Sequence, residues 1–215
     1  MNKLLKTGGV VAGVGLALCA GLVGYGWSLD TRWHVESSRL VAAPPSAVHA
    51  LLDDLTRYPE WITGDMPEGQ VYEVEYGART SGPGASYAWE MPGSMGEFTL
   101  VSSDPARGIT YEMVMERART PAQGSITLEP LDGGTRVVWV DEGDLGMRPV
   151  GGLLVSTVES TLGSHFDIAL AKLGALAEAS AQEQVDGDAR SAGEDDGDAA
   201  DEGQQGHEDA GHQHQ

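Results

Sequence analysis

The sequence predicts an α+β domain in which a curved antiparallel sheet of seven strands packs against a long C-terminal helix. Two periodic patterns lead to this prediction. Between Tyr72 and Trp139, large apolar residues take alternate positions and charged residues take many of the positions between them. Between Val150 and Glu178, apolar residues recur every three or four positions. A period of two is typical of strands with one covered face, and the longer period is typical of a helix with one buried side.

The first extended segment, residues 33–42, precedes a short amphipathic helix. Pro44 and Pro45 suit the first turn of a helix, because the amide hydrogen that proline lacks has no partner there. The apolar positions of this helix are Ala47, Val48, Leu51, Leu52 and Leu55. The Tyr-Pro-Glu-Trp segment at 58–61 is expected to end it, since a residue that precedes proline disfavours the helical region.

Six more strands follow, separated by segments rich in Gly, Pro and Asp that favour turns. The turn segments are 93–96, 104–108, 121–124 and 132–134. The predicted strands are 70–79, 85–91, 95–103, 108–117, 122–130 and 135–144. Short connections between alternating strands predict antiparallel pairing with one face covered.

The covered face of this sheet is the candidate ligand-binding surface. Its predicted lining is Tyr72, Tyr76, Tyr87, Trp89, Met91, Phe98, Leu100, Tyr111, Met113, Met115 and Trp139, with Leu162 and Phe166 from the long helix. Aromatic and methionine side chains with a few hydroxyls suit a hydrophobic or aromatic ligand. The alternative is that these side chains close on one another as an ordinary core.

Acid–base chemistry has little support in this lining. The glutamates of the strands alternate with the apolar residues, so they are predicted on the opposite face. His165 lies beside the apolar stripe of the long helix, where it either faces the cavity as an acid or base or stays at the solvent boundary. His34, His49 and Arg148 are weaker candidates.

Composition excludes several classes of function. The single cysteine, Cys19, leaves no disulfide framework, and the globular part contains no phosphate-binding glycine loop, zinc-spaced histidine pair or G-x-S-x-G motif. A net charge of −20 argues against nucleic acid. No cofactor or metal is expected. A loose divalent-metal site at His207, His212 and His214 is the alternative to a simple solvated tail.

An uncharged apolar segment precedes the domain. It runs from Thr7 to Leu29, and these 23 residues are long enough as a helix to cross a hydrocarbon core of ~30 Å. Lys3 and Lys6 precede it, so the positive-inside rule predicts a single-pass anchor with the N-terminus in the cytoplasm and the domain outside. A cleaved signal peptide and a lipoprotein signal at Cys19 are the alternatives.

Small residues recur every fourth position in this segment, at Gly9, Gly13, Ala17 and Gly21. Such a face allows two membrane helices to pack closely, so a weak homodimer is a candidate, although glycine is also simply common in membrane helices.

The C-terminal tail is strongly acidic. From Glu178 to Gln215 it contains twelve acidic residues, one arginine and no Leu, Ile, Phe, Tyr, Trp or Met. Such a segment cannot bury enough apolar surface to offset its conformational entropy, so residues 179–215 are predicted to be disordered.

Six short motifs, taken in order, resemble the START-like (SRPBCC) helix-grip superfamily and most closely its polyketide cyclase/dehydrase-like branch. They are Ala-Pro-Pro-Ser-Ala-Val at 43–48, Tyr-Pro-Glu-Trp at 58–61, Gly-Ala-Ser-Tyr-Ala-Trp-Glu at 84–90, Gly-Glu-Phe-Thr-Leu at 96–100, Gly-Gly-Thr-Arg-Val-Val-Trp at 133–139 and Phe-Asp-Ile-Ala-Leu-Ala-Lys-Leu at 166–173. The resemblance implies one strand, two short helices, six strands and a long helix that grips a cavity against the sheet. It also implies that Trp61 lies near the entrance of that cavity.

The expected organisation is an anchor or signal segment at 1–30, a helix-grip ligand-binding domain at 33–178 and a tail at 179–215. The expected function is a membrane-tethered module that binds a lipid, isoprenoid or polyketide-like molecule. A cyclase- or dehydrase-type enzyme acting on such a molecule is one alternative. A scaffold that displays the acidic tail without binding a ligand is the other.

Overall fold

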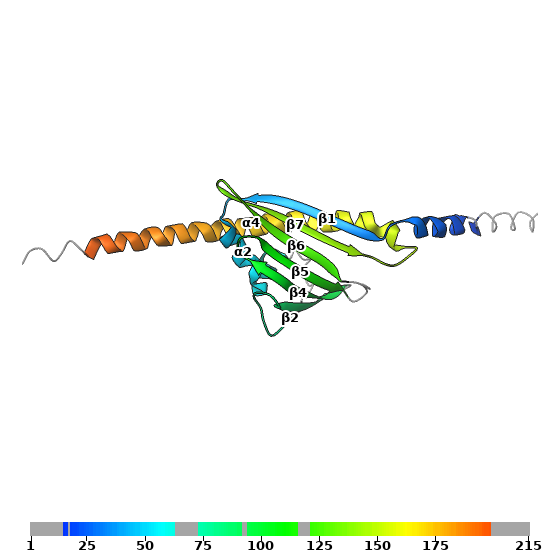
Figure 1. The fold of residues 1–215 in the computed structure, drawn as a ribbon, viewed down its shortest axis with the longest axis horizontal. Coiled ribbons are helices and arrows are strands. Elements are labelled where there is room, and N and C mark those ends of the chain that lie inside the picture. The colour runs from blue at the N-terminus through cyan, green and yellow to red at the C-terminus, as the bar shows by residue number, and fades with distance from the viewer. Residues whose placement is uncertain (1–14, 17, 63–72, 92–93, 116–120, 199–215) are drawn as a thin grey trace, which may run out of the picture.

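The computed structural model describes residues 15–16, 18–62, 73–91, 94–115 and 121–198. Seven antiparallel strands form one sheet in the order β1-β7-β6-β5-β4-β3-β2, and the long helix α4 packs against one face (Figure 1). Two short helices and a 3₁₀ turn lie between β1 and β2. The predicted α+β helix-grip fold is therefore confirmed.

The strands form where the alternation predicts them. Their bounds are β1 Arg32–Val41, β2 Glu73–Tyr76, β3 Ser86–Met91, β4 Ser94–Asp104, β5 Gly108–Met115, β6 Ala122–Leu131 and β7 Gly134–Asp144. Every boundary lies within three residues of the predicted one. In β1, for example, Trp33, Val35 and Val41 are buried while Arg32 and His34 are exposed.

The helix α2 (Pro45–Asp53) buries Ala47, Val48, Leu51 and Leu52, and it ends before the extended residue Asp54. The 3₁₀ turn η1 (Leu55–Arg57) follows.

Residues 58–61, expected to end the first helix, form the helical turn α3 (Tyr58–Trp61), which is the second of the two short helices that the resemblance implies. Tyr58 is helical although it precedes proline, with φ −55° and ψ −41°. Its hydroxyl donates to the Leu52 carbonyl at 2.8 Å, and its ring packs 4.9 Å from that of Trp61. These tertiary contacts outweigh the local steric preference.

The helix α4 (Gly151–Asp198) differs from the prediction at both ends. Leu154, one of the apolar residues that recur between Val150 and Glu178, is 40% exposed, and the fully packed part of the helix starts only at Phe166. The helix also continues beyond Glu178 to Asp198, within the segment for which disorder is predicted. Extending an existing helix requires no new nucleation, and the alanines and glutamines there propagate helix well without any buried surface.

The two ends of the sheet differ in how they are covered. At one end, which we call the α2 end, β1 finishes and β5 and β7 begin. There Thr135 Oγ1 donates to the Ala43 carbonyl at 2.7 Å, and Val48, Leu51 and Leu52 are fully buried. The opposite end, where β1 begins and β7 leads into α4, is called the β7–α4 end.

The edge strand β1 is bound along its length by acidic side chains of α4. The backbone N–H of His34 donates to Glu159 Oε1 at 3.2 Å, and that of Ala42 donates to Glu178 Oε1 at 2.9 Å. Between them, the Ser37 hydroxyl donates to the Asp167 carboxylate. The helix thus satisfies backbone donors that no neighbouring strand pairs with.

The described part of the N-terminal segment is helical at 15–16 and 18–28. Leu16, Leu18 and Leu22 are exposed along it. Within the part of the chain that the structure covers, no helix is both long enough and apolar enough to span a membrane. Residues 7–14 and 17 of the predicted span lie outside the described residues, so the predicted anchor stays a prediction.

The same limit applies to two other predictions. Of the small face, Gly9, Gly13 and Ala17 lie outside the described residues, while a side chain on Gly21 would meet open space. The three tail histidines lie outside them as well.

Candidate functional site

The middle of the covered face is filled by aromatic rings that pack on one another. The rings of Trp139 and Phe166 stack with centroids 3.9 Å apart, and those of Trp61 and Trp139 meet edge to face at 5.8 Å. Tyr87 stacks on Phe98 at 5.2 Å. All of these side chains are at least nine-tenths buried. Six of the predicted lining residues therefore lie together, largely in contact with one another: Trp61, Tyr87, Phe98, Tyr111, Trp139 and Phe166.

Most of the remaining predicted residues are only half-buried. Trp89, Met113 and Met115 lie toward the β7–α4 end of β3 and β5, and Leu162 comes from the first half of α4. Tyr76 is half-buried on the edge strand β2. Tyr72 and the side chain of Met91 lie outside the described residues. Trp89, Met113, Met115 and Leu162 are therefore only half-buried toward the β7–α4 end, although Trp33 and Asp141 are buried at that end.

A carboxylate that the sequence analysis missed lies on the covered face. Asp141 follows Val137 and Trp139 on the same side of β7 and is only 2% exposed. Trp139 Nε1 donates to the Tyr111 hydroxyl at 2.6 Å and lies 3.3 Å from Asp141 Oδ1. The Tyr111 hydroxyl in turn donates to the same Oδ1 in a short hydrogen bond. The lining in which the sequence analysis found little support for acid–base chemistry thus includes Asp141.

Gly124 makes this arrangement possible. The strand register places Tyr111, Gly124 and Asp141 opposite one another across β5, β6 and β7. A Cβ on Gly124 would lie 2.1 Å from Asp141 Oδ1 and 2.2 Å from Tyr111 Cζ. Because Gly124 lacks a side chain, the phenol and the carboxylate can meet above β6.

Burial strongly changes the acidity of this pair. It raises the pKa of Asp141 to about 7, although the hydrogen bonds from Tyr111 and Trp139 act in the opposite direction. Burial, followed by the charge of Asp141, raises the pKa of Tyr111 well above its ordinary value. A carboxyl group that titrates near neutrality can accept or donate a proton under physiological conditions.

His165 lies beside the aromatic cluster. Its ring centroid is 6.5 Å from that of Trp139 and 6.4 Å from that of Phe166, and the side chain is half-buried. Burial lowers the pKa of His165, so the neutral imidazole is favoured. It therefore occupies the boundary position that the sequence left open.

The weaker candidates have other surroundings. A β-bulge after Leu100 turns Ser103 toward α2, where its hydroxyl donates to the Asp53 carboxylate and lies 2.8 Å from His49 Nε2. In this chain the serine donates to the carboxylate rather than to histidine, so the three residues tie α2 to β4 and do not form a nucleophile triad. His34 and Arg148 are exposed.

One buried donor has no acceptor among the described residues. It is the indole Nε1 of Trp61, whose side chain is fully buried. Buried N–H groups are almost always paired, so a water molecule or a ligand oxygen is the expected acceptor. The sequence placed Trp61 in the lining by resemblance but gave no sign of this free donor.

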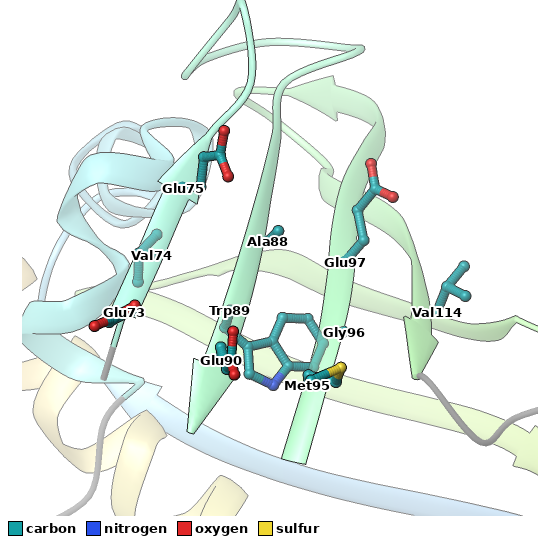
Figure 2. A pocket seen from close by; sticks show the side chains of 10 residues that line it. All are labelled: Glu73, Val74, Glu75, Ala88, Trp89, Glu90, Met95, Gly96, Glu97 and Val114. Carbon is teal, nitrogen blue, oxygen red and sulfur yellow. The ribbon is translucent and has the colours of Figure 1, made fainter. Parts of the chain in front are cut away.

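The opposite face of the sheet carries an acidic hollow of about 490 Å³ (Figure 2). Glu75, Ala88 and Glu97 form one row across β2, β3 and β4, and the small alanine leaves space between the two glutamates. Glu73 and Glu90 form a neighbouring pair. The strand glutamates thus lie on the face predicted for them. Among the residues that the structure describes, no three acidic, histidine or cysteine side chains are grouped as a metal site.

A family model described as polyketide cyclase / dehydrase and lipid transport matches residues 32–178. The chain belongs to this family. The match begins at the first residue of β1 and ends at Glu178 of α4, so it covers the predicted domain and leaves both terminal segments outside. No curated protein matches the chain.

Solved structures with the same fold come from several bacteria. Protein CV1439 from Chromobacterium violaceum is 23% identical, with a TM-score of 0.51, and the alignment covers 67% of this chain and 96% of that one. SA2116 from Staphylococcus aureus, described as a protein of unknown function, is 13% identical with a TM-score of 0.54, over 70% and 96%. TTHA0849 from Thermus thermophilus is 19% identical with a TM-score of 0.52, over 68% and 98%. At these identities the likeness establishes the fold.

Proposed function

We propose that this chain is a membrane-tethered module that binds a hydrophobic small molecule between the sheet and α4. Lipids, isoprenoids and polyketide-like molecules are the candidate classes. The observation that carries the proposal is the incomplete burial of Trp89, Met113, Met115 and Leu162 on an otherwise well-packed face. Apolar side chains that a domain leaves partly uncovered beside a buried polar group are typical of a ligand site. The family description, which names polyketide chemistry and lipid transport, supports the same class of ligand.

Two polar features can orient such a ligand by hydrogen bonds. Asp141 and Tyr111 offer a hydrogen-bonded pair, and both hydrogen bonds to Asp141 engage Oδ1. The ring of Trp61, whose indole N–H is free, lies 5.8 Å from the ring of Trp139. A hydroxyl or carbonyl oxygen on an apolar molecule would satisfy these groups, and a few fixed polar contacts are what gives an apolar pocket its specificity.

The tether is supported by sequence and exposure together. The segment Thr7–Leu29 has no charged residue, and Leu16, Leu18 and Leu22 in its described part are left uncovered by the domain. Lys3 and Lys6 before it favour a domain outside the cytoplasm. A weak homodimer through Gly9, Gly13, Ala17 and Gly21 is a further part of this proposal.

The test of ligand binding compares neighbouring residues on opposite faces of β5. The purified full chain is offered a lipid extract in detergent, and the retained molecules are identified by native mass spectrometry. Met113→Glu places a charge on the half-buried face and is expected to lower retention about tenfold or more, since an unpaired charge in an apolar site is costly. Val114→Glu changes the adjacent residue, which is 46% exposed on the other face, and should leave retention unchanged.

Two results would contradict the binding function. The first is that the wild-type chain retains no molecule and its tryptophan fluorescence responds to no lipid or aromatic probe, which would favour the scaffold. The second is that both glutamate variants lose retention equally while keeping wild-type circular dichroism, since the loss would then not report the covered face.

Asp141 specifically favours the second candidate function, an enzyme of the cyclase or dehydrase type. A carboxyl group with a pKa of about 7 is suited to removing a proton from carbon and returning one to a leaving hydroxyl. The molecules retained by the wild-type chain and by Asp141→Asn are compared by mass. A dehydrase should yield a wild-type ligand that is one water lighter than the variant's ligand, whereas a pure binding module should yield the same mass from both.

A further inference from the structure

Exposed apolar side chains gather at the β7–α4 end, where the N-terminal helix meets the domain. They come from the end of that helix, from the loop after β7 and from the first turn of α4. The exposed fractions are 58% for Tyr25, 56% for Trp27, 49% for Met147, 53% for Val150, 45% for Leu153 and 40% for Leu154. We call these six residues the collar.

Close backbone contacts join the three segments of the collar into one surface. A Cβ on Gly26 would lie 2.2 Å from the Pro149 carbonyl oxygen, and one on Gly152 would lie 2.4 Å from Leu29 Cβ. Arg148 Nη1 donates to the Trp27 carbonyl at 3.4 Å. Figure 1 shows the N-terminal helix in blue meeting the yellow start of α4 at this end. The collar therefore surrounds the point where the chain enters the domain.

We infer that the collar lies in the interfacial layer of a phospholipid bilayer and that the β7–α4 end of the sheet faces the membrane. The inference rests on the proposed tether and adds an orientation to it. The half-buried residues Trp89, Met113 and Met115 lie at this same end of the sheet. An apolar ligand would then pass between the lipid and the proposed site between the sheet and α4 without crossing water.

The chemistry of the collar fits a lipid surface. Trp and Tyr concentrate where the hydrocarbon core meets the headgroups, and here Tyr25 and Trp27 end the apolar segment. Arg148 is exposed beside them and donates to the Trp27 carbonyl, and a cation at this position suits anionic headgroups. The opposite, α2 end of the sheet is closed by buried leucines. A bilayer covers all six apolar side chains, and the tether holds it against them.

The test uses the full chain in vesicles of phosphatidylcholine and phosphatidylglycerol, with an environment-sensitive NBD label at one cysteine at a time. Val150→Cys and Leu153→Cys, each combined with Cys19→Ser, place the label in the collar. Leu131→Cys in the same background is the matched control, because Leu131 is also apolar and 50% exposed but lies in the β6–β7 turn at the α2 end. A label on the native Cys19 reports the tether itself.

The expected result is a blue-shifted emission at positions 150 and 153 that nitroxide-labelled lipid quenches, with neither effect at position 131. Quenching at Cys19 without quenching at 150 and 153 would overturn the inference while leaving the tether intact. No quenching at Cys19 would overturn the tether and the inference with it. A blue shift at 150 and 153 that persists in detergent without lipid and grows with protein concentration would mean that a second copy covers the collar, which also overturns the inference.

Discussion

The contribution of Asp141 to the free energy of unfolding changes with pH in the direction opposite to that of most carboxylates. Its pKa is about 7 in the folded protein because the side chain is buried, against an ordinary value near 3.8. The native state therefore binds the proton more tightly than the unfolded chain does. The stabilisation is fully present below the unfolded pKa and is lost as the pH rises through about 7. A shift of this size corresponds to about 4 kcal/mol at most.

We expect Asp141→Asn to raise the midpoint of thermal unfolding at pH 8 and to flatten its decline between pH 4 and about 7. Asparagine keeps the shape and still accepts a hydrogen bond from Tyr111, but it never bears the charge. Asp144→Asn is the control of opposite sign. The hydrogen bonds from Thr31 and from the Gly146 backbone lower the pKa of Asp144, so its contribution is lost as the pH falls. An unfolding midpoint of Asp141→Asn that follows pH as the wild type does would contradict the burial of a proton at this site.

Asp141 also shows how much of the site the sequence can predict. The alternation through Val137 and Trp139 extends to Asp141. A lining chosen for its aromatic residues ends at Trp139, and Asp141 is the next residue on the same face of the strand. Periodicity places Asp141 on the covered face, yet it does not reveal that Tyr111 and Trp139 supply its hydrogen bonds. Those bonds depend on the pairing of β5, β6 and β7, and Gly124 alone in the sequence does not specify that pairing.

Among the elements, α4 consists of two parts with different physical roles. From Phe166 to Ala177 it buries Phe166, Ala169, Leu170, Leu173 and Ala177 against the sheet and α2. From Gln182 onward its described side chains are exposed. This second part is therefore helical without packing against the core. The prediction of disorder for the tail assumes that a segment without buried apolar surface forms no helix, so it does not separate helix formation from packing.

Deleting residues 186–215 should leave the thermal midpoint of the domain unchanged within a few degrees, while lowering the helical signal in far-ultraviolet circular dichroism. The comparison is Phe166→Ala, which removes the ring stacked on Trp139 and should cost about 3–5 kcal/mol. A deletion as destabilising as Phe166→Ala would mean that the exposed part of α4 packs against the domain after all.

The sheet was the most predictable element because each strand carries its own alternation and is bounded by its own turn residues. The local sequence does not predict the short turn α3, since the pair Tyr58 and Pro59 disfavours a helix, and only the resemblance implies a second short helix. Only the contact of Tyr58 with Leu52 and Trp61, which are brought together by the fold, stabilises that turn.

For the whole molecule, the proposed tether predicts that the domain works at a membrane surface. We expect the full chain to stay in the membrane fraction after alkaline carbonate extraction, whereas a chain that begins at Asp30 should be released. A phosphatase reporter fused after Gln215 should be active only if the C-terminal side is outside the cytoplasm, as the two lysines before the apolar segment predict. A green fluorescent protein fused at the same point and fluorescent in the cytoplasm would reverse the orientation.

The carboxylates of α4 that bind β1 also determine how copies of this protein can meet. An unpaired edge strand is the usual route by which sheets extend into aggregates. Here Glu159 binds the amide of His34 in β1 and Glu178 binds the amide of Ala42 directly after β1, and the other edge, β2, has four residues and carries Glu73 and Glu75. Neither edge offers a long neutral template for a further strand. When these domains are crowded together they should therefore remain separate sheets, so any pairing of the chains is left to their helices.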